Sequence, residues 1–141
     1  MSNHTEILKK AEAMLTKRNK AKGYATISLL DKNGYPTGSP ASIENSQGLE
    51  WVTFNAGIES NKVARIKNDN RGSISITTED NTITLVGHFE ILTDMESKKA
   101  HWNPMWAEFW TGYEDQNHCI LRFIPKSYNL WIDYEEACGD L

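Results

Sequence analysis

The hydrophobic positions near the N-terminus repeat with the period of an α-helix. The stripe comprises Ile7, Leu8, Ala11, Met14 and Leu15, which is the spacing of one helical face. Asn3 and Glu6 have the spacing of a capping box at the start of such a helix. The pattern predicts an amphipathic N-terminal helix that ends before Gly23.

After Gly23 apolar residues alternate with polar ones, and clusters of Gly, Asn and Asp interrupt the alternation. This pattern predicts six or seven strands separated by turns. The predicted strands cover residues 24–30, 36–44, 49–55, 72–78, 82–92, 118–124 and, as a short seventh, 128–133. The turn Asp31–Gly34 makes the first two strands a hairpin, and Gly87 predicts a bulge or bend within the fifth.

Two helices are predicted between the fifth and sixth strands. Thr93 and Glu96 have capping-box spacing and open a helix that runs to about Trp102. Asn103 followed by a proline predicts the start of another helix. Mostly antiparallel strands with several helices in 141 residues indicate a mainly β fold with helices (α+β), a small closed barrel with helical covers, in a single domain over residues 1–141.

Charge and cysteine content narrow the class of protein. The net charge is −4 and the pI is about 5.5, which argues against a nucleic-acid-binding protein because that class needs a basic face. The two cysteines form no CxxC motif, and no apolar run approaches the ~20 residues that span a bilayer. We therefore expect a cytoplasmic protein without a membrane or nucleic-acid partner.

Aromatic residues gather in one short stretch of the chain. Trp102, Trp106, Phe109, Trp110 and Tyr113 lie within twelve residues, and the last four have the i, i+3, i+4, i+7 spacing of one helical face. In one interpretation this aromatic wall packs onto the barrel or onto a second subunit. In the other it forms a wall of a pocket for a flat ligand.

A short helix predicted over residues 60–68 offers the best anion-binding site in the sequence. Ser60 is its expected N-cap, and Lys62 lies in its first turn. A cation there opposes the helix dipole, so an anionic partner explains it, and Arg65 can reach the same side. The alternative is ordinary surface charge.

No motif for catalysis by the protein's own side chains is present. The chain has no GxSxG elbow, P-loop or GxGxxG sequence, and no two of its four histidines have a helical metal-binding spacing. Cys119 lies in an apolar strand, as buried core cysteines do. Any chemistry therefore has to come from a bound cofactor, and no catalytic residue or metal ligand is predicted.

The order of several short motifs resembles that of one known family. The motifs are Asn33-Gly-Tyr-Pro36, Ser39-Pro-Ala-Ser42, Thr53 through Lys62, Gly87 through Asp94, Trp102 through Trp106, and Leu121 through Pro125 followed by Trp131. Their order and spacing over roughly residues 5–133 are similar to the general stress protein branch of the pyridoxamine-5'-phosphate-oxidase-like FMN-binding split barrels.

The resemblance implies a six-stranded antiparallel split β-barrel with an N-terminal helix and helical covers, which forms a homodimer with FMN at the subunit interface. In this family a Ser-x-Lys sequence at a helix start binds the flavin phosphate, and a tryptophan approaches the flavin from the partner subunit in the oxidases. The implied cofactor-binding residues are Ser60 and Lys62 at the phosphate, and Phe54, Asn55, Ser39, Ser42, Ile43 and Trp131 along the flavin. Arg65, which the helix spacing places on the same side, is also expected at the phosphate.

The chain departs from the family pattern at three places. Many relatives carry Arg-Pro-Met in the second strand, where this chain has Ser39-Pro-Ala41, so that one cation is missing. Relatives often carry Thr-Asp before the Ser-x-Lys loop, where this chain has Ala56-Gly57. The C-terminal Arg-x-His-type motif of the true oxidases is absent, which argues against vitamin B6 oxidation.

These features predict a dimeric FMN-binding flavoprotein. We expect an oxidoreductase that passes electrons between a small-molecule donor, such as a reduced nicotinamide, and an acceptor. One alternative is a non-catalytic module that binds or senses flavin in a stress response. Another is a relative that has lost the cofactor, which the missing second-strand arginine supports. A deazaflavin or haem are alternatives to FMN.

Overall fold

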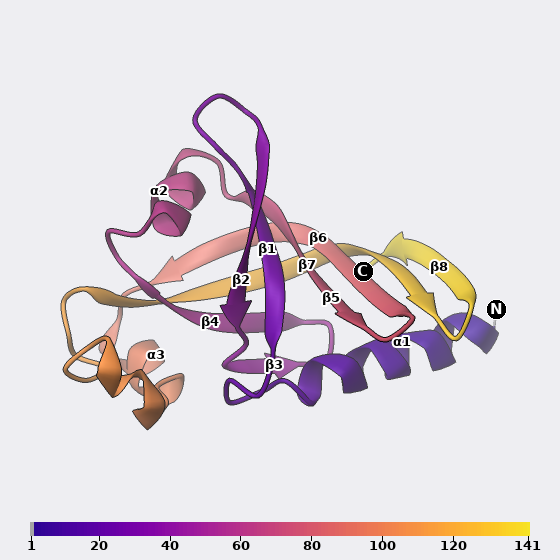
Figure 1. Ribbon diagram of the computed structural model, residues 1–141, viewed down its shortest axis with the longest axis horizontal. Helices are drawn as coiled ribbons and strands as arrows, with labels where there is room; N and C mark the ends of the chain where they lie inside the picture. The colour runs from indigo at the N-terminus through magenta and orange to yellow at the C-terminus, as the bar shows by residue number, and fades with distance from the viewer. Residues whose placement is uncertain (1) are drawn as a thin grey trace.

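The structure, a computed structural model, describes residues 2–141 (Figure 1). Within these residues lie three α-helices, one short 3-10 helix and eight strands. The helices are α1 (Ser2–Thr16), α2 (Asn61–Asn68) and α3 (Met95–Ala100), and the 3-10 helix spans Pro104–Glu108. The strands are β1 (Tyr24–Leu30), β2 (Pro36–Ser42), β3 (Asn45–Gln47), β4 (Trp51–Gly57), β5 (Arg71–Thr78), β6 (Asn81–Leu92), β7 (His118–Ile132) and β8 (Glu135–Asp140).

The strands form one antiparallel sheet that curls into a half-barrel (Figure 1). Their order is β2-β1-β5-β6-β7-β4-β3, and β8 pairs with β7. The two edge strands, β2 and β3, follow each other in the chain, and between them the backbone N–H of Glu44 donates to the C=O of Thr53 in β4 at 2.9 Å. In the part of the chain that the structure describes, no ladder joins β2 to β4 beyond this point. The barrel is therefore split between these two strands, and the predicted mainly β fold with helices is confirmed.

Strand β7 corrects the prediction of two separate strands on either side of Pro125. It is a single strand of 15 residues. Pro125 lies opposite Gly87, where the register between β6 and β7 shifts. A bulge accommodates a proline inside a sheet because it interrupts the hydrogen-bonded ladder. The bulge predicted at Gly87 is therefore confirmed.

The expected count of six strands is wrong, because β3 and β8 were not predicted. β3 has three residues, too few to show an alternating pattern. β8 is acidic, and it forms because β7 extends beyond β4 and leaves an edge to pair with. Asp133 and Tyr134, at φ 53 and 66, both adopt the left-handed conformation of a tight hairpin turn.

The apolar stripe of α1 packs against the sheet as predicted. Ile7, Ala11 and Leu15 are buried in the hydrophobic core, and α1 ends before Gly23. The helix begins before the predicted capping residue Asn3, whose side chain lies outside the described residues.

The N-cap of helix α3 lies one residue later than predicted. Its N-cap is Asp94, whose carboxylate accepts a hydrogen bond from the Ser97 N–H at 2.9 Å, and not Thr93. A carboxylate one residue further on thus replaces the threonine hydroxyl. α3 also ends at Ala100, before the predicted end near Trp102.

The aromatic stretch does not form the predicted single helical face. Asn103 caps the following helix as predicted, because its Oδ1 accepts from the Met105 N–H at 3.1 Å. That helix is a 3-10 helix that ends at Glu108. Regular helical spacing therefore does not extend from Trp106 to Tyr113.

Candidate functional site

A cavity of about 780 Å³ lies at the split between β2 and β4. It is enclosed by these two strands, by the start of α2 and by the segment around the 3-10 helix. Its lining consists of Tyr24, Ile27, Pro40, Ala41, Ser42, Phe54, Asn55, Ala56, Gly57, Ser60, Lys62, Met105, Trp106, Glu108, Phe109, Trp110 and Leu121.

The start of α2 supplies an anion-binding arrangement to this cavity. Ser60 caps the helix as predicted, accepting from the Val63 N–H at 3.3 Å. The first N–H groups of a helix have no intrahelical partner, so those of Asn61 and Lys62 remain available. The half-buried Lys62 ammonium has no carboxylate within ion-pair distance among the described residues. Burial, and then the neighbouring Arg65, hold the pKa of Lys62 below its ordinary value. A desolvated cation beside free N–H groups favours an anionic ligand.

The backbone of β4 supplies hydrogen-bonding groups to the same cavity. The Thr53 C=O accepts from Glu44, so its backbone groups point away from β7. Alternate residues of a strand point their backbone groups to the same side, and those of Asn55 therefore point to the open edge. A planar ligand with both donors and acceptors can pair with this edge.

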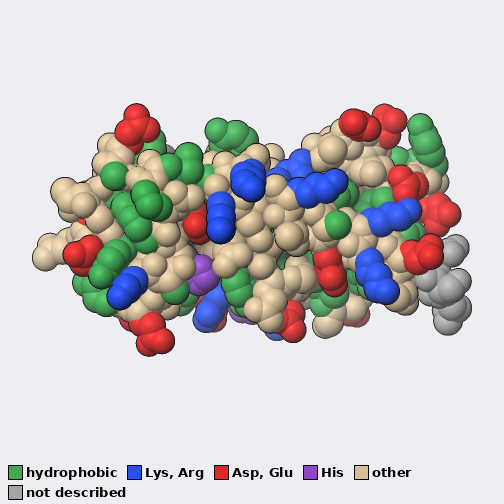
Figure 2. Space-filling model, turned by 90° about the horizontal axis from the view of Figure 1, so that it is seen from below, with side chains coloured by type: hydrophobic (Ala, Val, Ile, Leu, Met, Phe, Trp, Pro, Cys, Tyr) green, Lys and Arg blue, Asp and Glu red, His purple; other side chains and the backbone are tan. Residues whose placement is uncertain are grey.

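One side of the cavity is closed by an aromatic cover, which we define as residues 102–113. The rings of Trp106, Phe109 and Trp110 contact one another, with centroids 5.9 to 6.2 Å apart, and all three line the cavity. Phe109 is 67% exposed. Hydrophobic side chains gather at the end of the molecule that carries α3 and the 3-10 helix (Figure 2). The geometry therefore favours the interpretation of these three rings as a pocket wall.

Glu44 anchors the aromatic cover to the segment between β2 and β3. The Trp106 indole N–H donates to its carboxylate at 3.3 Å, and Glu44 is 7% exposed. Burial raises the pKa of Glu44, although hydrogen bonds from Trp106 and Asn103 oppose that shift. The sequence pattern did not identify this residue, because an acid at a strand end is typical of the surface.

Asn55 joins the cavity to a second buried group. Its Oδ1 lies 2.6 Å from Nε2 of His118, and its Nδ2 donates to the C=O of His101 at 3.2 Å. His118 is 1% exposed, and its Nδ1 lies 3.2 Å from the C=O of Tyr113. Sequence reasoning missed His118, since the four histidines are scattered along the chain.

The structure brings five of the nine predicted cofactor-binding residues to the cavity. They come from β2, from β4 and from the start of α2. These residues are Ser42, Phe54, Asn55, Ser60 and Lys62. Their role in binding FMN stays a prediction.

The other four predicted residues do not line this cavity. Arg65 donates to Thr37 Oγ1 at 3.2 Å and lines a separate polar cleft beside the β1–β2 turn. Ile43 is fully buried in the hydrophobic core and does not line the cavity. Ser39 pairs with β1 in the middle of β2. Trp131 is 42% exposed and lies between β6 and β8, beyond the bulge in β7.

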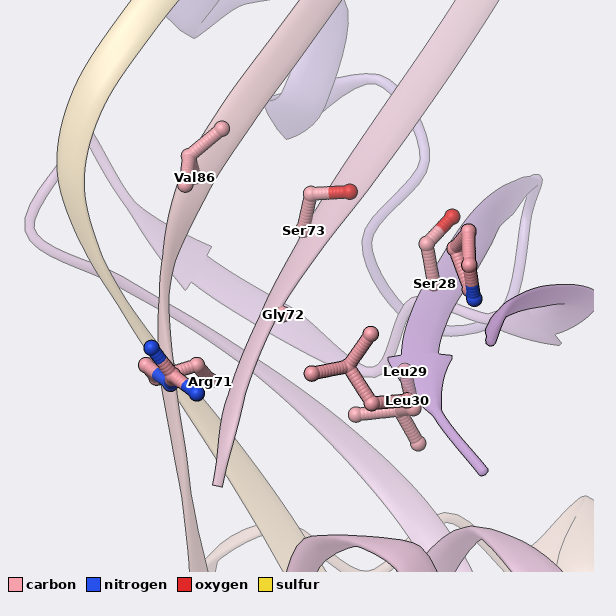
Figure 3. A pocket seen from close by; sticks show the side chains of 8 residues that line it. Ser28, Leu29, Leu30, Arg71, Gly72, Ser73 and Val86 are labelled. Atoms are coloured by element: carbon pink, nitrogen blue, oxygen red, sulfur yellow. The ribbon is translucent and has the colours of Figure 1, made fainter. Parts of the chain in front are cut away.

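A second cavity, of about 350 Å³, lies against β1, β5 and β6 (Figure 3). Its lining is small or apolar except for Arg71, which pairs with Asp69 at 2.7 Å. The other lining residues are Ser28, Leu29, Leu30, Pro36, Gly72, Ser73 and Val86. None of the nine predicted cofactor-binding residues lines this second cavity, whereas five line the cavity at the split. We therefore take the cavity at the split as the candidate site.

The described residues give little support for a cysteine nucleophile or for a metal-binding site. Cys119 is buried as predicted, and burial raises its pKa to about 11, which keeps the thiol protonated. In residues 2–141, His, Cys, Asp and Glu side chains form no group of three that could hold a metal ion. No helix in the same range has the length and apolarity needed to span a membrane.

Comparison with known proteins identifies the family. A sequence model described as Pyridoxamine 5'-phosphate oxidase like matches residues 5–138. Because the match spans nearly the whole chain, the chain belongs to this family, and the predicted resemblance is confirmed. No curated protein matches the sequence.

Solved structures share the fold at low sequence identity. A protein from Clostridium acetobutylicum, described as related to general stress protein 26 of B. subtilis, has a TM-score of 0.83 at 20% identity, covering 96% of this chain and 95% of that chain. General stress protein 26 from Bacillus anthracis str. Sterne has a TM-score of 0.77 at 17% identity, with coverages of 95% and 98%. A structure described as F420 reductase has a TM-score of 0.64 at 16% identity, with coverages of 83% and 94%. These similarities establish the fold.

Proposed function

We propose that this chain binds FMN in the cavity at the β2–β4 split and acts as a flavin-dependent oxidoreductase. The observation that carries the proposal is the half-buried Lys62 ammonium, which lies beside the free N–H groups of α2. A phosphate with a charge of about −1.5 to −2 matches this arrangement, because it neutralises the desolvated cation and accepts from the helix N-terminus.

The remainder of the cavity also fits FMN. The pyrimidine edge of the flavin carries donors and acceptors, which match the open backbone groups of Asn55. Trp106 and Trp110 offer apolar faces that exclude water from a planar ring system. Bound FMN supplies electron and hydride transfer, while Ser60 and Lys62 hold its phosphate and β4 orients its ring.

The direct test is titration of FMN with the purified protein. We expect flavin fluorescence to change to a saturable plateau and the melting temperature to rise, since ligand at about 100 times Kd adds about 2.7 kcal/mol to the free energy of unfolding. Coenzyme F420 serves as the parallel ligand, because a protein of the same fold is described as F420 reductase. If F420 binds more tightly than FMN, the cofactor is a deazaflavin and not FMN. If neither ligand binds, the proposal is refuted.

Turnover separates an oxidoreductase from a non-catalytic flavin-binding module. With FMN bound, we expect steady oxidation of NADH or NADPH in the presence of an artificial electron acceptor, above the rate of free FMN. Saturable binding without turnover over a panel of acceptors would favour a sensing role in a stress response.

We propose that the protein is a homodimer and that Trp131 contacts the flavin bound to the partner. Its 42% exposure and its distance in the fold from the cavity of its own chain support this arrangement. Sedimentation at micromolar concentration is expected to give twice the 16.0 kDa of the chain. Trp131→Ala is expected to weaken FMN binding, and an unchanged Kd in that variant would contradict this role.

We also propose that residues 1–141 form one FMN-binding domain of the cytoplasm. A single hydrophobic cluster that extends from Ile7 to Ala137 supports one domain. The two cysteines, Cys119 and Cys138, are free, which agrees with a reducing compartment.

A further inference from the structure

His118 occupies a position in which both of its ring nitrogens face oxygen atoms. Nε2 lies 2.6 Å from Asn55 Oδ1, and Nδ1 lies 3.2 Å from the backbone oxygen of Tyr113. The orientation of the Asn55 amide is determined by its own donor, because Nδ2 bonds to the C=O of His101 at 3.2 Å. Reversing the amide would bring two oxygens together. Only an imidazolium can donate to both acceptors at once, since a neutral imidazole carries one N–H.

Two indole rings flank His118. The centroids of Trp102 and Trp110 lie 5.2 and 5.0 Å from that of the imidazole, at interplanar angles of 87° and 58°. Both indoles belong to the aromatic cover, and Trp110 also lines the cavity. His118 therefore contacts the cover through Trp102, Trp110 and Tyr113, and it contacts β4 through Asn55.

The charged groups around His118 act in opposite directions. Burial lowers its pKa below the ordinary value of 6.5, the Tyr113 carbonyl and Asp115 raise it, and the Lys98 ammonium lowers it. Lys98 is 3% exposed and donates to the C=O of Asp115 at 2.9 Å. His101, behind Asn55, also has a lowered pKa because of burial and Arg122. The net direction favours a neutral His118 at pH 7 and above.

A neutral His118 can keep only one of its two hydrogen bonds. The shorter contact, to Asn55, takes the single proton on Nε2. The Nδ1 lone pair then faces the Tyr113 oxygen, and that contact is no longer bonded. Adding a proton to Nδ1 restores the bond between His118 and the backbone of the cover, and it places a cation against two indole rings.

We propose that His118 is a proton-controlled positioning residue, which fastens the aromatic cover onto β4 as an imidazolium and releases its Tyr113 end when neutral. The effect on the cofactor rests on the proposed function, because the cover encloses the cavity assigned to FMN. The proton equilibrium and the fastening of the cover do not depend on that assignment. No bond other than N–H is formed or broken, and the proton is exchanged with water.

The first test uses the wild-type protein without cofactor. Nitrogen-15 NMR of the His118 ring is expected to show both nitrogens protonated at acidic pH and the Nε2–H tautomer alone at alkaline pH, with a midpoint below 6.5. An Nδ1–H tautomer at alkaline pH, or a ring that stays neutral to the acid limit of the folded protein, would overturn the proposal.

The second test measures the cover itself, again without cofactor. Hydrogen exchange of residues 102–113 is compared between the wild type and His118→Gln, at one pH below the His118 midpoint found by the first test and at one pH well above it. The glutamine can donate to Asn55 but does not titrate. We expect the wild-type cover to be more protected than the variant below the midpoint and equally protected above it. If the wild type and the folded variant are equally protected at both pH values, the proposal that His118 fastens the cover is refuted.

The third test asks whether the fastening of the cover by His118 affects the release of FMN. The ratio of FMN dissociation rates, variant over wild type, is expected to rise about tenfold or more between a pH above the His118 midpoint and a pH below it, as one charge-assisted bond forms. Titration of the FMN phosphate is common to both proteins and cancels in the ratio. A constant ratio would overturn the effect on the cofactor. Failure of FMN to bind either protein would instead refute the proposed function. The two cofactor-free tests would still decide whether protonated His118 fastens the cover.

Discussion

Lys62→Gln is expected to raise the Kd for FMN by about 10-fold to 100-fold. The physical reason is the loss of one charge-assisted contact to a phosphate, which contributes about 1.5–3 kcal/mol, and each 1.4 kcal/mol is a factor of ten in Kd. The measurement is fluorescence titration of FMN at fixed ionic strength, because phosphate contacts weaken with salt. Riboflavin, which lacks the phosphate, is expected to bind both proteins equally.

The same substitution is expected to leave the cofactor-free protein as stable as the wild type, or slightly more stable. Burial holds the pKa of Lys62 below its ordinary value in the folded state. The charged form is therefore disfavoured by folding, and it costs stability at every pH below the folded pKa, including pH 7. Thermal unfolding without ligand would show this as an unchanged or raised melting temperature, which distinguishes a ligand-binding lysine from a structural one.

Lys67→Gln is the matched control for Lys62→Gln. Lys67 is exposed in the last turn of the same helix, and it does not line the cavity. The control removes the same charge from α2 and is expected to change Kd by less than about twofold, as a screened surface charge does. Equal losses in the two variants would indicate a general field effect, and the assignment of the phosphate to Lys62 would then be wrong.

Local patterns predicted the elements that are determined by neighbouring residues. The stripe of α1 and the Ser60 cap of α2 depend on side chains within one or two helical turns, so sequence spacing was sufficient to place them. The same is true of the bulge at Gly87, where a residue without Cβ marks a close approach. Among these predictions, the Ser60 cap placed the start of α2, which lines one end of the cavity.

Contacts between distant residues could not be predicted in this way. Trp106 and Glu44 are 62 positions apart, and His118 and Asn55 are 63 positions apart. Their proximity follows from the pairing of β4 with β7 and from the path of the aromatic cover, which the curl of the sheet determines. The aromatic spacing alone suggested a regular helix, but the chain leaves the 3-10 helix at Phe109 to reach Trp110 and His118.

Gly87→Ala is expected to lower the free energy of unfolding by about 3 kcal/mol or more, the upper range for overpacking a close contact. A Cβ at this position would lie 2.0 Å from the Ile124 carbonyl oxygen, 2.9 Å from its carbonyl carbon and 3.0 Å from the Pro125 Cα. All three atoms belong to the backbone of β7, so no side chain can rotate away. The melting temperature is expected to fall by about 10 °C, at about 3 °C per kcal/mol for a chain of this size.

Gly38→Ala in β2 is the control for this substitution. Its Cβ would meet the Thr26 methyl at 3.2 Å, and a side-chain atom can shift by a few tenths of an ångström, so we expect a change within about 1 kcal/mol of the wild type. Equal stability of Gly87→Ala and the wild type would mean that β6 and β7 can separate at the bulge. That outcome matters for the site, because the bulge lies at the point where one edge of β7 changes from pairing with β4 to pairing with β8. A rigid bulge therefore fixes the point along β7 at which its pairing with β4, a strand that lines the cavity, ends. The part of β7 that carries Trp131 begins beyond this point.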